Sequence, residues 1–176
     1  CASALIQGAH YYSKNPNDTV GLTAYNIGGY KPGDIEVVAA FDVADTKVGK
    51  DVSEAIYAKP NNTVTVFQVP HMGITVQRGP TLDGIGRHLG QIVTPSNDPE
   101  VDVKKVLKDT GAEMLVNYLP VGSTNAVRFY ATQALEAGIG FLNAIPVFIA
   151  SEPKWQQVFA EKKLPLAGDD VMSQLG

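Results

Sequence analysis

The residue that most clearly suggests chemistry is Asp42, which directly follows the apolar run 35–41. In an open parallel sheet, ligands bind at the carboxyl ends of the strands. A carboxylate there can accept hydrogen bonds from both hydroxyls of an adenosine ribose, and its charge repels a 2'-phosphate, which favours NAD over NADP. The alternative is that Asp42 caps a helix that follows the strand. The residues alone leave both interpretations open.

Two further segments place polar residues after apolar runs. In residues 119–123 (LPVGS), Gly122 permits a close backbone approach, and Ser123 can cap a helix whose N-terminus could face a nicotinamide or a phosphate. In Gly168-Asp169-Asp170, adjacent acids point to different sides, so one can face a ligand while the other caps or pairs. Ordinary strand–loop–helix junctions and solvated turns use the same residues, so a purely structural role stays open for both segments.

The elements that would position these residues follow from hydrophobic periodicity. Short apolar runs predict buried parallel strands over residues 35–41, 114–118, 140–144 and 164–167. Helical spacing predicts helices over residues 45–57, 101–107, 123–137 and 151–162, with Ser123 and Ser151 as N-caps. This alternation predicts an α/β fold: a Rossmann-like, doubly wound, mostly parallel sheet with helices on both faces.

The sequence predicts a single domain over residues 1–176. Residues 14–33 are rich in Asn, Gly and Pro and are expected to form a loop, and residues 60–99, with an apolar run at 63–67, are expected to form an inserted ribbon and short helix. The chain opens inside an amphipathic helix, without a preceding strand or glycine-rich turn. We therefore expect a partial NAD-binding domain that lacks its first strand.

Composition argues against several classes of protein. The net charge of -4 and the absence of a basic patch disfavour nucleic-acid binding. No apolar run reaches the roughly 18 residues that span a bilayer, so we expect no membrane partner and a cytoplasmic location. The three histidines lack metal-ligand spacing, and the single cysteine, Cys1, has no evident His and acid partners, so neither a metal site nor a cysteine nucleophile is expected.

Several longer strings, taken in order, carry a family resemblance. They are CAS at residues 1–3, VAAFDV at 38–43, KVG at 47–49, VQRGPTLDG at 76–84, YLPVGS at 118–123, NAIPVFIAS at 143–151 and GDD at 168–170. Together they resemble myo-inositol-1-phosphate synthase (inositol-3-phosphate synthase) of the bacterial and archaeal type, along essentially the whole chain.

The resemblance implies an isomerase at the first step of inositol biosynthesis, and hence of phospholipid biosynthesis. Such an enzyme converts D-glucose 6-phosphate to 1L-myo-inositol 1-phosphate by oxidation, enolisation, intramolecular aldol cyclisation and reduction, with the same NAD used in both redox steps. Such an enzyme is a cytoplasmic homotetramer. The resemblance further implies that the C-terminal catalytic and tetramerisation domain of the family is absent from these 176 residues. The alternatives are an NAD-dependent dehydrogenase of another small substrate and a non-catalytic nucleotide-binding or interaction module.

The resemblance also implies roles for particular residues. Asp42 would hold the adenosine ribose, the 119–123 segment would line the nicotinamide side, and Asp170 with Ser173 would face the active site. The implied cofactor-binding set is Ala2, Asp42, Leu119, Pro120, Val121, Ser123, Ala144 and Asp170, and the implied catalytic pair is Asp170 and Ser173. The chain departs from the family at Met172, where many members have Lys. Because no lysine here lies in a motif that matches the family's catalytic lysines, we expect these 176 residues to be inactive by themselves.

Overall fold

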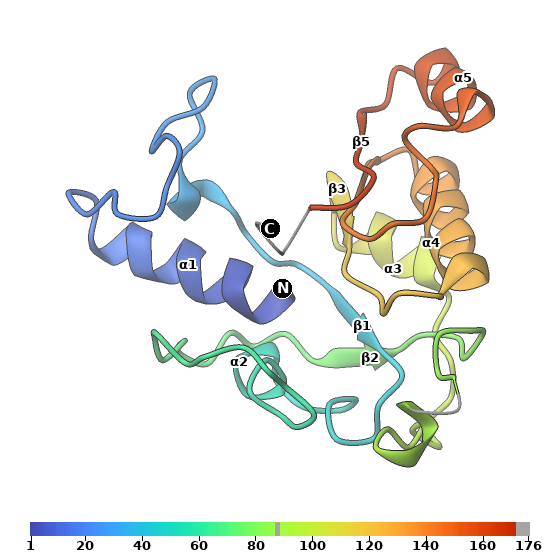
Figure 1. The fold of residues 1–176 in the computed structure, drawn as a ribbon, viewed down its shortest axis with the longest axis horizontal. Helices are drawn as coiled ribbons and strands as arrows, with labels where there is room; N and C mark the ends of the chain where they lie inside the picture. Colours follow the sequence, from blue (N-terminus) through green and yellow to red (C-terminus); the bar gives the residue numbers. More distant parts are fainter. Residues whose placement is uncertain (87–88, 172–176) are drawn as a thin grey trace.

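The computed structural model describes residues 1–86 and 89–171. All pairs of strands in these ranges are parallel, in two separate sheets (Figure 1). One sheet pairs β1 (Ala40–Asp42) with β2 (Val76–Arg78), and the other has the order β3 (Met114–Asn117), β4 (Gly140–Asn143), β5 (Leu166–Ala167). The helices are α1 (Ala2–Lys14), α2 (Val52–Ala55), α3 (Val103–Asp109), α4 (Thr124–Ala137) and α5 (Pro153–Glu161), with 3₁₀ turns η1 (Pro32–Asp34) and η2 (Leu89–Gln91). The predicted parallel α/β fold is confirmed, although its strands are divided between two sheets.

Helix α4 is the centre of the larger hydrophobic core. Val127, Ala131 and Ala134 are fully buried and recur at intervals of four and three, which places them on one face of the helix. That face packs on β3 and β4, where Phe141 is also buried. The helix ends at Gly138, whose φ of 81° suits a glycine C-cap. The predicted helix 123–137 is therefore confirmed.

Helices α3 and α5 correspond to the helices predicted over 101–107 and 151–162. Helix α3 packs against α4, and the carboxylate of Asp102 caps it by accepting the N–H of Lys105 (2.9 Å). Phe159 of α5 lies in the same core. The prediction of Ser151 as the N-cap of α5 was wrong. Glu152 holds that position, because Ser151 bonds to a residue near the end of the described chain, Asp169.

A smaller core joins α1 to the first sheet. Its buried side chains include Ile6, Val52 and Val76. Gln7 is fully buried, and its Oε1 accepts the backbone N–H groups of Val66 (2.8 Å) and Phe67 (3.1 Å). Residues 63–67, expected to form part of a ribbon, are bonded to this side chain and form no strand.

The predicted helix over 45–57 was wrong. Gly49 adopts a φ of 82°, which interrupts a helix. Asp51 then caps the short helix α2: its carboxylate accepts the N–H of Ser53 (2.9 Å) and also those of Met72 (3.1 Å) and Ile74 (2.9 Å). Because the last two donors come from distant residues, helical periodicity could not reveal this cap.

The first predicted strand is also shorter than expected, since only residues 40–42 pair with a neighbour. Strand β2 is the one strand in the described part of 60–99, and it joins β1 in parallel rather than forming a separate ribbon. In this register Asp42 lies opposite Arg78. The end of β1 is thereby fixed beside the end of β2.

Candidate functional site

Asp42 ends β1 and is held by its own following turn. Its Oδ1 accepts the backbone N–H groups of Val43 (2.7 Å) and Ala44 (2.9 Å), while Lys47 Nζ lies 2.9 Å from its Oδ2. The side chain is 29% exposed. Asp42 therefore caps a turn rather than a helix, and its second oxygen is paired with Lys47.

The turn after Asp42 is tied to the neighbouring strand. The N–H of Lys47 donates to Ala44 O (3.0 Å), and the N–H of Gly49 donates to Val76 O (2.9 Å). Within this turn, the hydroxyl oxygen of Thr46 is buried and has no hydrogen-bond partner among the described residues. A bound ligand or water could satisfy it. The sequence offered no signal for Thr46, because a Thr in a turn is ordinary.

Residues 79–84, here called the strap, follow β2 in the sequence and reach the N-terminus of α4 in space. The N–H of the first strap residue donates to Asp42 O (3.0 Å). The buried guanidinium of Arg78 fixes the base of the strap: Nε donates to Ser96 O (3.1 Å) and Nη2 to Thr81 Oγ1 (2.6 Å). The strap therefore links the end of β1 to the second sheet.

The far end of the strap caps α4. Asp83 accepts the N–H groups of Asn125 (2.7 Å) and Ala126 (2.9 Å). Ser123, expected to be the cap, instead donates its hydroxyl to Pro120 O (2.6 Å) and forms no side-chain cap. A phosphate at this helix N-terminus would have to displace the Asp83 carboxylate, so the structure gives no support to an anion site there.

The loop 119–122, expected to line the nicotinamide side, follows β3 at the same rim. Leu119 is half-buried and anchored, since its N–H donates to Asn117 Oδ1 (3.1 Å). Pro120 and Val121 are exposed, the latter at 74%. Gly122 has a φ of 95° and open space around it. The outer part of this loop can thus meet a ligand.

A buried polar network of Asn117, Asn143 and Asp169 joins the carboxyl ends of the second sheet. Asn117 Nδ2 donates to Asn143 Oδ1 (2.7 Å), and Asn143 Nδ2 lies 2.8 Å from Asp169 Oδ1. Both asparagines are buried, at 4% and 0% exposure. In the sequence the two asparagines lie within the predicted strands 114–118 and 140–144. Their occurrence as the last residues of β3 and β4 was a signal that could have revealed the network.

Asp169 anchors the loop that follows β4. Its carboxylate accepts the N–H groups of Ile149 (2.8 Å), Ala150 (2.9 Å) and Ser151 (3.1 Å). Partial burial opposes ionisation of this carboxyl, but the hydrogen bonds from Asn143 and the three backbone N–H groups outweigh it and lower its pKa. Asp169 therefore pairs within the fold and holds this loop in place.

Curated relatives match the chain over its whole length. No protein-family model matches the chain. The inositol-3-phosphate synthases of Mycolicibacterium smegmatis, Corynebacterium glutamicum and Mycobacterium tuberculosis are 50%, 49% and 47% identical to it over its whole length. The chain is a homologue of the inositol-3-phosphate synthases. The resemblance found in the sequence is thereby confirmed, and the chain spans about half the length of these relatives, 48–49%.

Two solved structures share the fold. The crystal structure of Ari2 superposes with a TM-score of 0.82 at 33% identity, covering 99% of this chain and 52% of that one. A myo-inositol-1-phosphate synthase-related protein from Thermotoga maritima matches with a TM-score of 0.63 at 21% identity, covering 96% of this chain and 51% of that one. The second match shows likeness of fold alone.

The other residues implied by the synthase resemblance are placed as follows. Ala144 is buried, at 4% exposure, and its carbonyl oxygen accepts the N–H of Val171 (3.4 Å). Asp170, which directly precedes Val171, is exposed and lies in the left-handed region with a φ of 68°. Ala2 is exposed in the first turn of α1. Ser173, like Met172, lies outside the described residues.

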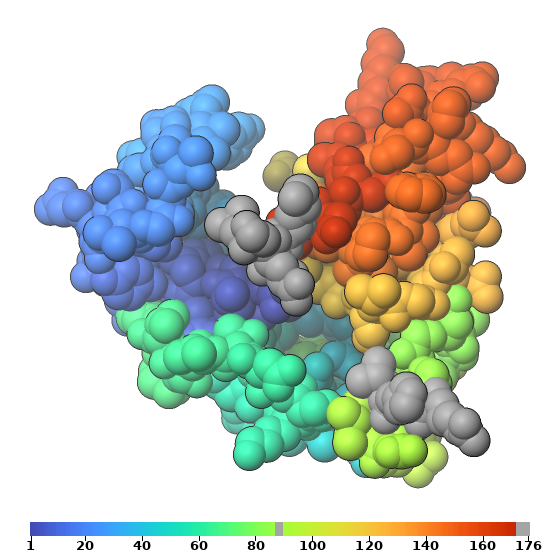
Figure 2. All heavy atoms as spheres, viewed as in Figure 1, coloured from blue at the N-terminus to red at the C-terminus, as the bar shows by residue number. Residues whose placement is uncertain are grey.

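Short contacts connect several of the candidate residues of this synthase homologue. The strap joins the end of β1 to Ser123, the N–H of Ala144 donates to Asn117 O (3.0 Å), and Ala144 in turn contacts Val171 beside Asp170. In Figure 2, a hollow opens between the blue segment after α1 and the red and orange segments of β5 and α5. Within the described residues the two sheets share no strand pairing, and the strap links β1 to α4, so Asp42 ends a strand of one sheet and Asp170 follows a strand of the other.

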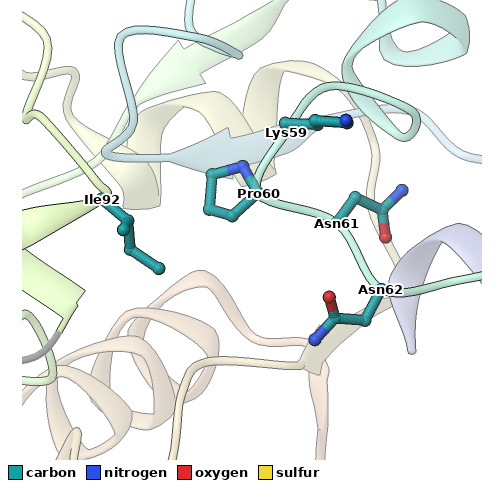
Figure 3. A pocket seen from close by; sticks show the side chains of 5 residues that line it. All are labelled: Lys59, Pro60, Asn61, Asn62 and Ile92. Atoms are coloured by element: carbon teal, nitrogen blue, oxygen red, sulfur yellow. The ribbon is translucent and has the colours of Figure 1, made fainter.

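An open groove elsewhere is lined by Lys59, Pro60, Asn61, Asn62 and Ile92 (Figure 3). None of the rim residues lines it. Over residues 1–86 and 89–171, no group of three or more His, Cys, Asp or Glu side chains could hold a metal ion. No helix in those same ranges is long and apolar enough to cross a membrane.

Proposed function

We propose that this chain forms the NAD-binding part of an inositol-3-phosphate synthase. The whole protein would convert D-glucose 6-phosphate to 1L-myo-inositol 1-phosphate, as a cytoplasmic homotetramer. The observation that carries the proposal is the 47–50% identity to three such synthases, which is continuous along the whole chain. The 176 residues by themselves would not catalyse the conversion, because none of their lysines lies in a catalytic motif of the family.

The rim fits a dinucleotide. Asp42 offers a partly exposed carboxylate at the end of β1, where a ribose diol can donate hydrogen bonds to it. The exposed residues 120–122 and the exposed Asp170 offer surfaces for the nicotinamide half.

The residues of the chain would position the reacting groups. Bound NAD would supply the redox chemistry by accepting a hydride from the sugar and returning it later. Asp42 would orient the adenosine ribose, and the carboxylate of Asp170 would face the active site together with Ser173. Asp169 would keep the adjacent backbone in place through its bonds to residues 149–151.

An assay of the intact protein tests this proposal. Purified protein is incubated with NAD and D-glucose 6-phosphate, and both inositol phosphate and NADH are measured. We expect inositol phosphate to form without net NADH, since the hydride is returned. Accumulation of NADH without cyclised product would instead identify a dehydrogenase. The absence of any rise in melting temperature on addition of NAD would contradict cofactor binding, because a ligand that binds only the native state stabilises it.

A further inference from the structure

The ion pair between Asp42 and Lys47 bears on which cofactor the site selects, an inference that rests on the proposed function. Asp42 Oδ1 is committed to the turn, because it accepts two backbone N–H groups. The oxygen that remains for a ribose hydroxyl is Oδ2, and Lys47 Nζ lies 2.9 Å from it. Lys47 therefore contacts the atom that a ribose diol has to reach.

The fold holds Lys47 in this position. Its N–H donates to Ala44 O (3.0 Å), and its carbonyl oxygen accepts the N–H of Lys50 (3.1 Å). The side chains of Lys47 and Asp42 are only 27% and 29% exposed. The pair is therefore partly shielded from solvent, where charges interact more strongly than they do on an open surface.

The charge of Lys47 acts differently on the two nicotinamide dinucleotides. NAD presents an uncharged diol, which has to share Asp42 Oδ2 with the ammonium group of Lys47. NADP presents a 2'-phosphate, which a bare carboxylate repels and a neighbouring ammonium group attracts. We propose that Lys47 is a specificity-determining residue that weakens the preference of this site for NAD over NADP.

Three single variants of the intact protein test the proposal. Lys47→Met removes the charge but keeps a long stem, Lys47→Arg keeps the charge, and Lys50→Met removes an exposed charge from the same turn. Calorimetric titration with NAD and with NADP gives the ratio of the two dissociation constants. In Lys47→Met we expect NAD to bind at least as tightly as in the wild type and NADP to bind about tenfold more weakly. Lys50→Met should keep the wild-type ratio.

Asp42→Asn separates failure of this inference from failure of the proposed function. If the wild type binds NAD and Asp42→Asn binds it more weakly, the ribose site stands. In that case an unchanged ratio in Lys47→Met, or an equal change in Lys47→Arg, would overturn the role of Lys47 alone. If the wild type binds neither dinucleotide, the proposed function and the role of Lys47 fail together.

Discussion

Asn143 Nδ2 and Asp169 Oδ1 lie 2.8 Å apart, across the carboxyl ends of β4 and β5. The same carboxylate holds three successive backbone N–H groups of the loop after β4. The amide of Asn143 therefore connects the sheet to a carboxylate that fixes the loop. This relationship places the adjacent Asp170 at the rim.

Asp169→Asn should destabilise the protein. The amide has one acceptor oxygen in place of two, and its NH2 group would face backbone donors. We expect the free energy of unfolding to fall by about 2 kcal/mol, the cost of leaving buried donors without partners. Urea unfolding should show a lower midpoint at an unchanged m-value. Asp45→Asn, at an exposed aspartate, is the control, and an equal midpoint for the two variants would contradict the role of Asp169.

The stability of the protein should fall in acid. The hydrogen bonds to Asp169 lower the pKa of its carboxyl, and those from Ser53, Met72 and Ile74 outweigh burial and lower that of Asp51. A lowered folded-state pKa contributes stability that is present above the unfolded-state pKa of about 3.9 and is lost as the pH falls towards the folded-state pKa. Unfolding free energies measured at decreasing pH should decline below about pH 4. The decline should be smaller in Asp169→Asn, and identical slopes would contradict the prediction.

Asp83→Ala should weaken the start of α4. The substitution leaves the N–H groups of Asn125 and Ala126 without their acceptor, and a lost N-cap costs about 1 kcal/mol. Asp83→Asn keeps one acceptor oxygen and should retain part of the stability. Chemical unfolding of the two variants gives the comparison. If alanine and asparagine were equally harmless, the strap would not cap the helix.

Gly84→Ala should be far more damaging than Gly86→Ala. Gly84 has a φ of 89°, and a methyl group there would lie 2.0 Å from Ser123 Oγ, whereas one at Gly86 would meet no atom within 4 Å. We expect a loss of more than about 1 kcal/mol for the first variant, through strain and overpacking. Thermal unfolding of the matched pair would show it, and equal melting temperatures would mean that the strap is not packed on Ser123.

Asp42→Ala in the intact protein should weaken NAD binding by roughly 1–3 kcal/mol, because the ribose hydroxyls lose their acceptor. Asp45→Ala removes a nearby exposed carboxylate and should leave the affinity unchanged. Calorimetric titration with NAD compares the two. An affinity that is the same for both variants would remove Asp42 from the cofactor site.

Much of the larger core could be read from periodicity. Val127, Ala131 and Ala134 recur at helical spacing, and the apolar runs at 114–118 and 140–144 have the length typical of buried strands. Asp42 could likewise be identified, because a polar residue directly after a buried strand is expected at the carboxyl edge of the sheet. These signals depend on residues close together in the chain.

The caps and the polar network could not be read in this way. Asp83 reaches α4 from 42 residues away, and Asp169 reaches Asn143 from 26 residues away. Two predictions were wrong where such distant contacts decide the structure. They are the helix over 45–57 and the capping of α4 by the side chain of Ser123. The sequence by itself determined which segments are apolar, that predicted strands alternate with predicted helices, and which family the chain resembles. Only the tertiary structure decided which carboxylate satisfies which backbone N–H, because folding brings donors and acceptors together from distant segments that no local pattern links.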